Sequence, residues 1–345
     1  MSDADRYMWQ TGRYAKQILF HGVGEEGQDR IGRSRVTVVG LGALGTVIAS
    51  NLCRAGVGHL RLVDRDFVEL SNLQRQILFD EEDADRRMPK AAAAAEKLCA
   101  INSEIEIEPL IVDVSAGNVE KIIGGSTLVM DGTDNLETRF LLNDACVKND
   151  LPWIYGAALG ATGNVMTIVP GETPCLRCLM EEAPAPGTMP SCDTEGVLAA
   201  LTGVVASVEC AEALKLLVGR CPSSALLCID VWDRDFYDIT VERREDCPAC
   251  AQGEYAYLSG ARTSWATALC GRDAVQIVPP TEQEISLEGL RQRLSRIGSV
   301  SYNGFLLSFE TDDRELVIFP TGRAIIRGTT DETEARSLYT RYVGA

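Results

Sequence analysis

The sequence of 345 residues has two histidines, no long apolar run and no excess of basic residues. Its 33 Lys and Arg residues are outnumbered by 50 Asp and Glu residues. The net charge of −17 argues against DNA, RNA or an anionic membrane surface as a partner, because phosphate groups bind to basic surfaces. The longest apolar run, Val197–Val208, is too short to cross a bilayer. The N-terminus is polar and acidic and carries no secretory signal, so we expect a cytoplasmic protein.

Length and composition indicate a globular protein with two domains. Hydrophobic residues make up 46% of the chain and charged residues 24%, which is ordinary for a globular protein. The pattern of the chain changes after Cys250, and residues 253–260 resemble a linker. We therefore expect a larger domain over residues 1–253 and a small α+β domain over residues 254–345.

A glycine-rich turn lies between two apolar runs near the N-terminus. Val36–Val39 leads into a turn in which Gly40 permits a tight bend, Gly42 lets a phosphate approach the backbone, and Gly45 lets a helix pack on the strand. The helix start offers free N–H groups to an anion. Asp64, at the end of the second apolar run, stands where an acid can bind a ribose hydroxyl. The pattern predicts a nucleotide site; the alternative is a glycine-rich packing turn.

Charged residues after this turn favour a nucleoside triphosphate over NAD. Arg75 lies in a polar loop, Lys90 opens an alanine-rich helix, and Asp134 follows an apolar strand. A triphosphate needs cations to neutralise its phosphates and an acid to hold Mg²⁺, whereas a dinucleotide does not. Each residue also has a plain structural interpretation: Arg75 in a surface salt bridge, Lys90 at a solvated helix start, and Asp134 as a helix N-cap. Together they predict phosphoryl or nucleotidyl transfer.

Two Cys-x-x-Cys pairs predict a structural zinc site. Cys175 and Cys178 form the first pair, and Cys247 and Cys250 the second. Each pair can bind from one tight turn, and four thiolates close a tetrahedral site without an open position for substrate. A disulfide or a redox pair is the alternative. We expect the seven cysteines outside these pairs and outside position 192 to be mostly buried small hydrophobic residues; they are Cys53, Cys99, Cys146, Cys210, Cys221, Cys228 and Cys270.

Cys192 is a candidate nucleophile. It lies in a segment rich in proline and glycine, just before a helix expected from about Gly196. A helix N-terminus lowers the pKa of a thiol, whereas the neighbouring Asp193 and Glu195 raise it. Neither of the two histidines is near it in the sequence. The alternative is an incidental cysteine.

These motifs resemble those of the ThiF/MoeB/HesA family, the prokaryotic relatives of ubiquitin-activating enzymes. The resemblance rests on GLGALG, LVDRD, SNLQRQILF, PK and DGTDN, extends from about Arg13 to Cys250, and includes an N-terminal signature at Arg13–Ile18. It implies ATP-dependent adenylation of the C-terminal glycine of a small ubiquitin-like sulfur carrier that ends in Gly-Gly. The product would become a thiocarboxylate for molybdopterin or thiamine synthesis or tRNA thiolation. It also implies a homodimer, with the helix over Val197–Val218 at the interface, and a possible persulfide protein as sulfur donor.

The motifs and the resemblance together define a predicted site for ATP and Mg²⁺. In the family an N-terminal arginine reaches the ATP of the neighbouring subunit; the matching residue here is Lys16, which keeps the charge and loses the bidentate fork. We expect catalytic roles for Arg75, Lys90, Asp134 and Cys192, with Asp134 also holding Mg²⁺. The predicted ATP-binding residues are Gly40, Gly42, Ala43, Gly45, Asp64, Asp66, Ser71, Asn72, Arg75, Lys90, Asp134 and Asn135, with Lys16 from the partner subunit.

Alternating strands and helices predict a doubly wound, mostly parallel α/β sheet for the larger domain. For the smaller domain we expect strands near 268–269, 275–278, 304–309, 316–319 and 324–327, and helices over 287–297 and 332–342. Its role is either docking of the carrier or sulfur donor, or stabilisation. Three other functions stay open for the whole chain: adenylation of another carboxylate, a non-catalytic nucleotide-binding regulator, and an NAD oxidoreductase.

Overall fold

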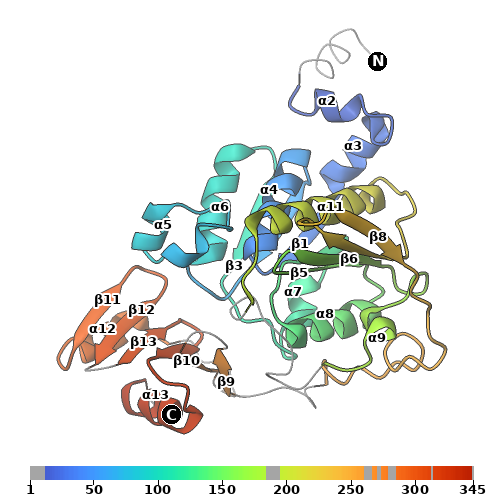
Figure 1. Cartoon of the computed structure of the whole chain (residues 1–345). Helices are drawn as coiled ribbons and strands as arrows, with labels where there is room; N and C mark the ends of the chain where they lie inside the picture. Colours follow the sequence, from blue (N-terminus) through green and yellow to red (C-terminus); the bar gives the residue numbers. More distant parts are fainter. Residues whose placement is uncertain are drawn as a thin grey trace. The chain divides into compact units, whose positions relative to one another are not determined.

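A computed structural model describes residues 12–183, 195–259, 266–269, 273–278, 285–311 and 314–343. These residues divide into two compact units, which are described separately (Figure 1). The larger unit holds the described residues up to Ser259 apart from Arg86–Met88 and Glu195, which group with the smaller, C-terminal unit. The predicted domains, 1–253 and 254–345, are regions expected to fold independently, and these limits stay a prediction. No helix among the described residues is long and apolar enough to cross a membrane.

The larger unit is built on an eight-stranded sheet with the order β3-β2-β1-β4-β5-β6-β7-β8. The first five strands in this order are parallel, and β6, β7 and β8 continue the sheet in antiparallel pairs. This confirms the predicted mostly parallel α/β sheet. The strands are β1 Arg35–Val39, β2 His59–Val63, β3 Glu106–Leu110, β4 Leu128–Asp131, β5 Trp153–Leu159, β6 Thr162–Ile168, β7 Leu226–Asp230 and β8 Asp235–Ile239.

Helices cover both faces of this sheet (Figure 1). On one face α6, α4 and α11 follow one another across β2, β1, β5 and β6, and on the other face α7 and α8 lie together. The two faces are buried, which explains why β1, β2 and β4 are almost entirely buried and are rich in Val, Leu and Met. The helices are α2 Ala15–Ile18, α3 Gly24–Arg33, α4 Ala43–Ala55, η1 Leu70–Asn72, α5 Glu81–Asp85, α6 Lys90–Ile101, α7 Val119–Ile123, α8 Leu136–Lys148, α9 Leu176–Leu179 and α11 Ala199–Leu217.

Where the structure describes it, the smaller unit contains a six-stranded antiparallel sheet and the helices α12 and α13. The strand order is β11-β12-β13-β14-β10-β9. Its buried core includes Phe309, Leu316 and Ile326 from the sheet and Leu290 and Ala335 from the helices. The elements are β9 Ala266–Leu269, β10 Ala274–Ile277, α12 Leu287–Leu294, β11 Ser299–Tyr302, β12 Leu307–Thr311, β13 Arg314–Ile318, β14 Ala324–Arg327 and α13 Glu332–Tyr342.

Three predictions about local structure are wrong. Strand β11 was not expected, because its residues are mostly exposed and lack an apolar alternation; its pairing with β12 defines it. The sequence predicts a strand over 237–241, but the last strand of the large sheet, β8, begins two residues earlier, at Asp235. A tight turn with Arg234 at φ +63° sets its register with β7. Cys99 and Cys221 are exposed, although Cys53, Cys146 and Cys210 are buried as predicted; Cys270 lies outside the described residues.

Candidate active site

Two loops meet where the strand order of the sheet reverses. Strands β1 and β4 are neighbours although β2 and β3 come between them in the sequence, and such switch points are where open α/β sheets bind ligands. Gly40, with φ +85°, ends β1, and a Cβ there would lie 2.7 Å from the Gly132 carbonyl carbon in the loop after β4. A Cβ at Gly45 would overlap the Gly40 carbonyl oxygen. Two backbone segments therefore touch, and only glycine fits at these positions.

The start of α4 is partly exposed. Gly42 is the N-cap of this helix and Ala43 its first residue, and both are only partly buried. A Cβ at Gly42 would make ordinary contacts, the nearest at 3.8 Å. The first N–H groups of the helix lack intrahelical partners and carry the positive end of the helix dipole. The arrangement can accept a phosphate.

Asp64 holds the glycine turn in place. One carboxylate oxygen of Asp64 accepts a hydrogen bond from the Leu41 N–H at 2.6 Å, and the other accepts from the Asp66 N–H at 2.7 Å. Burial raises the pKa of Asp64, whereas the nearby Lys90 ammonium and both N–H donors oppose that rise. Lys90 Nζ lies 3.9 Å from the Asp66 carboxylate, and Lys90 is only 4% exposed. Lys90 is therefore no solvated helix start; its charge is buried beside two acids.

The polar loop after β2 reaches the glycine turn. Asn72 is buried and its side-chain oxygen accepts from the Glu69 N–H, which closes a capping box around η1. Ser71 is exposed on the same turn, and its carbonyl accepts from Arg75 Nη1 at 3.0 Å. The amide nitrogen of Gln76, a buried residue, is 4.0 Å from the position of a Gly42 Cβ. The loop thus carries Arg75 to the same end of the sheet as the glycine turn.

The loop after β4 leaves Asp134 exposed. Asn135, and not Asp134, caps α8, since its side chain accepts from the Thr138 N–H at 2.8 Å. Asp134 therefore has no cap to make, and its carboxylate is available at the carboxyl end of β4. A carboxylate oxygen at such a place is the ligand type that Mg²⁺ prefers.

Two of the predicted residues stand apart from this group. Lys16 is exposed on the short helix α2, and the chain by itself does not bring it to the glycine turn. Cys192 lies outside the described residues. The remaining predicted residues fall on the turn after β1, the end of β2, the loop that follows, the start of α6 and the loop after β4.

Several charged residues of this site carry no recognisable motif in the sequence. Arg65 pairs with Asp113 at 3.0 Å; burial lowers the pKa of this guanidinium, but Asp113, Asp66 and Asp134 raise it further than burial lowers it. Asp131 and Arg139 form a buried ion pair of 3.0 Å behind Asp134. Arg139 follows Asp134 by five residues. Its position on the inner face of the helix expected after Asp134 is the feature of the sequence that could have pointed to it.

The four paired cysteines converge on one point. Their Sγ atoms all lie within 4.8 Å of one another, with Sγ–Sγ distances of 3.9 Å for Cys175–Cys178, 3.6 Å for Cys175–Cys247 and 3.5 Å for Cys178–Cys250. A tetrahedral zinc with Zn–S bonds of about 2.3 Å requires sulfur separations of about 3.8 Å. The donor set and its spacing fit zinc.

Comparisons with known proteins agree with this arrangement. Residues 14–249 match the ThiF family. A sulfur carrier protein ThiS adenylyltransferase of Bacillus subtilis is 41% identical over 337 residues, 97% of this chain and 100% of that protein. The SAMP-activating enzyme E1 of Haloferax volcanii is 42% identical over 246 residues, 71% of this chain and 90% of that enzyme. A crystal structure of Escherichia coli MccB with AMPCPP and MccA has a TM-score of 0.63 at 20% identity, over 70% of this chain and 74% of that chain, which shows a shared fold. As the motifs predicted, the chain belongs to the ThiF family.

Proposed function

We propose that this protein is an ATP-dependent adenylyltransferase that activates the C-terminal glycine of a small ubiquitin-like sulfur carrier. The observation that carries the proposal is the meeting of the glycine turn after β1 with the Asp134 loop after β4, with Lys90 buried beside them. This arrangement supplies an anion site, a fixed cation and an exposed carboxylate at one end of the sheet. The relatives named for adenylation of sulfur carriers support the same reaction.

The proposed reaction is attack of the carrier carboxylate on the α-phosphorus of Mg·ATP. A new acyl–oxygen–phosphorus link forms, the bond to the pyrophosphate breaks, and pyrophosphate leaves. Arg75 and Lys90 stabilise negative charge on the phosphates, and Asp134 holds the Mg²⁺ that arrives with ATP. The start of α4 receives a phosphate. Asp64 keeps the turn in shape through its two backbone hydrogen bonds and is proposed to bind the ribose. Asp66, Ser71, Asn72 and Asn135 are proposed to complete the nucleotide site.

The edge strand β8 is the proposed docking surface for the carrier. Every residue of β8 is exposed, and large apolar side chains gather on it and on the turn before it: Trp232 is 77% exposed, and Phe236 and Tyr237 are also exposed. A free strand edge offers unpaired backbone groups to another sheet, and apolar neighbours add affinity. The Phe236→Asp variant should raise the KM for the carrier and leave that for ATP unchanged. An unchanged carrier KM would exclude this surface.

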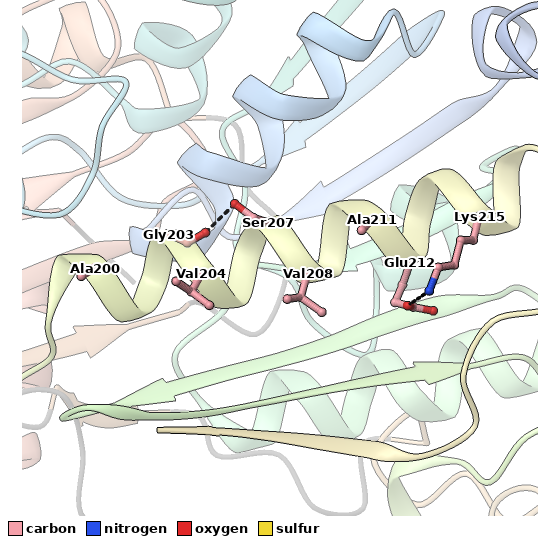
Figure 2. Close-up of a pocket in the computed structure, with 8 residues that line it drawn as sticks. All are labelled: Ala200, Gly203, Val204, Ser207, Val208, Ala211, Glu212 and Lys215. Carbon is pink, nitrogen blue, oxygen red and sulfur yellow. Dashed lines mark hydrogen bonds and ion pairs between the residues drawn. The ribbon is translucent and has the colours of Figure 1, made fainter. Parts of the chain in front are cut away.

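The outer face of α11 is the proposed homodimer interface. Figure 2 shows one side of this helix, where a shallow groove lies along small side chains. The Ser207 hydroxyl donates to the Gly203 carbonyl at 2.6 Å and so presents no unpaired donor to a partner. A second copy seated here could bring its Lys16 to the phosphates. Sedimentation should show a dimer that the Val204→Arg variant disrupts; a monomeric wild type would refute the interface. The lining residues are Ala200, Gly203, Val204, Ser207, Val208, Ala211, Glu212 and Lys215.

Zinc at the four cysteines is proposed to stabilise the fold and to take no part in the reaction. The cluster joins two segments that are 72 residues apart in the sequence. Arg177, between two of the cysteines, donates to the carbonyls of Glu181 and Glu254 and so extends the link on both sides. Four thiolates leave no open position for substrate.

The later sulfur step is proposed to use Cys192. A persulfide sulfur on Cys192 would attack the carrier's acyl carbon, and AMP would leave, which gives an acyl disulfide. A thiol reductant would then attack the Cys192 sulfur, form a disulfide with it and release the carrier thiocarboxylate. A persulfide protein is the expected sulfur donor, and the thiocarboxylate product would serve thiamine or molybdopterin synthesis or tRNA thiolation. The Cys192→Ser variant should keep adenylation and lose thiocarboxylate formation. Loss of neither would make the cysteine incidental.

ATP–pyrophosphate exchange tests the adenylation. The purified protein is assayed with a panel of carriers that end in Gly-Gly, beside the Asp134→Ala variant and an Asp150→Asn control. Asp150 lies at the exposed turn that follows α8, where its φ of +53° is tolerated by asparagine. Exchange that requires one carrier, is lost in Asp134→Ala and survives in Asp150→Asn would support the proposal. No exchange with any carrier, despite bound ATP, would favour another carboxylate or a regulatory role.

A further inference from the structure

A buried ion pair lies directly behind Asp134. Arg139 of α8 is 8% exposed, and its Nε donates to a carboxylate oxygen of Asp131 at 3.0 Å. Its Nη2 donates to the Thr133 carbonyl at 2.7 Å and to the Gly156 carbonyl at 2.8 Å. The other oxygen of Asp131 accepts from the N–H and the hydroxyl of Thr133, at 2.9 and 2.7 Å. One guanidinium thus joins the end of β4, the loop after it, and β5.

The contacts determine how the loop leaves the strand. The Thr133 carbonyl is drawn inward to Arg139, so the peptide plane between Thr133 and Asp134 has one orientation. On the other side, Asn135 is held as the N-cap of α8. Asp134 therefore sits between two anchored residues, with its side chain exposed.

The loop also touches the glycine turn. The Gly132 N–H donates to the Val39 carbonyl at 2.7 Å, and the Gly132 backbone touches Gly40. The glycine turn is held separately by the Asp64 carboxylate, which accepts from the Leu41 N–H at 2.6 Å. A displacement of the Asp131–Thr133 segment would therefore move the carboxylate of Asp134 and leave the turn at the start of α4 in place. Burying an ion pair costs free energy unless hydrogen bonds satisfy the buried donors and acceptors. Here both oxygens of Asp131 accept hydrogen bonds, and the guanidinium of Arg139 donates to that carboxylate and to two carbonyls.

We propose that Asp131 and Arg139 are positioning residues that aim Asp134 at the metal of Mg·ATP. This inference rests on the proposed function for its ligand, but its contacts are independent of the carrier. Neither residue reaches the surface where the phosphates would lie; they act through the backbone of Thr133. Groups that orient a metal-binding side chain typically contribute about 10- to 100-fold to metal affinity or activity.

The Arg139→Lys variant separates geometry from charge. Lysine keeps the positive charge beside Asp131, but it has no planar fork with which to reach the carboxylate and both carbonyls together. The matched control is Arg61→Lys. Arg61 of β2 is equally buried, and its guanidinium also binds a carboxylate, that of Glu108 at 2.9 Å, and the carbonyls of Ile122 and Gly124. These carbonyls precede β4, whereas the site follows it.

Two measurements test the inference. The first is calorimetric binding of ATP without carrier, with Mg²⁺ and with EDTA in its place; the second is the Mg²⁺ concentration at half-maximal exchange. Arg139→Lys should weaken binding of Mg·ATP roughly tenfold or more and raise the half-saturating Mg²⁺ in proportion, with metal-free ATP binding unchanged. Arg61→Lys should lower thermal stability and leave both values unchanged.

Two results would overturn the inference. One is an equal loss of ATP binding by Arg139→Lys with and without Mg²⁺, which a general structural defect would produce. The other is an unchanged response to Mg²⁺ in a folded Arg139→Lys protein. If wild-type protein shows no exchange with any carrier, the proposed function fails, and the calorimetric comparison alone still decides the role of Arg139.

Discussion

Glu209 on α11 is a carboxyl group in a place that disfavours its charge. It is 0% exposed, and neither of its carboxylate oxygens has a hydrogen-bond partner among the described residues. It lies against Gly156, where a Cβ would overlap its carboxylate. Burial raises the pKa of Glu209 well above its ordinary value, the negative charge of Asp131 raises it further, and Arg139 opposes both. The phenol of Tyr155 and the thiol of Cys210 also interact with its charge.

A raised pKa in the folded protein has a definite effect on stability. The protonated carboxyl stabilises the fold fully below the ordinary glutamic acid pKa, and this contribution is lost as the pH rises through the raised folded-state pKa. One proton bound only by the folded state corresponds to about 1.4 kcal/mol per pH unit. Between pH 5 and pH 7.5 the loss is therefore about 3 kcal/mol while Glu209 stays protonated in the folded state.

The Glu209→Gln variant removes this titration and keeps the shape of the side chain. We expect its free energy of unfolding to exceed that of the wild type by an amount that grows with pH, by about 1.4 kcal/mol per unit. Urea unfolding of both proteins at several pH values, with excess zinc throughout, measures this difference. The subtraction cancels the titration of every group that the two proteins share.

Glu212→Gln is the matched control on the same helix. Glu212 is nearly as buried, but it pairs with Lys215 and accepts from the Ser223 N–H at 3.2 Å. Its substitution should remove both contacts and lower the free energy of unfolding. A difference between Glu209→Gln and wild type that stays constant from pH 5 to pH 7.5 would refute the reasoning, since Glu209 would then titrate alike in both states.

Three further predictions follow from the structure. Gly40→Ala should destabilise the larger unit by more than about 1 kcal/mol, the strain of a left-handed residue. It should also abolish ATP binding, because the new Cβ would press on Gly132. Gly171 also has a positive φ but has open space around it, so Gly171→Ala should show the strain alone in the same melting and binding assays. Metal analysis should find one zinc ion per chain, and Cys247→Ser should lose it together with much of the stability, since metal binding energy is folding energy; a stable, zinc-free wild type would contradict this. Truncation after Ser259 should leave carrier-dependent exchange intact, because the Haloferax volcanii relative matches only 71% of this chain over 90% of its own length; loss of exchange in a folded truncated protein would assign the smaller unit a role in carrier docking.

Local pattern was enough to predict the framework of the larger unit. The buried strand before Gly40, the helix after it and the helix end at Gly56 follow from residue type, because a left-handed backbone favours glycine and a parallel strand covered on both faces must be apolar. The metal site of the paired cysteines was equally predictable, because the Cys-x-x-Cys spacing alone lets both cysteines of a pair bind the same metal. Edge strands such as β11 were not, because half-exposed strands carry little apolar alternation and are defined by their neighbours.

The sequence by itself determined the family, the nucleotide-type turn and the four cysteines, because each is a short motif whose chemistry depends on local spacing. Only the tertiary structure decided which charges are buried and what they touch. It placed Lys90 out of solvent, assigned the α8 cap to Asn135, and revealed that Arg139 and Glu209 both lie against Gly156 of β5. Burial and pairing arise between segments far apart in the chain, so they exist only when the sheet has brought the ends of β1, β4 and β5 together.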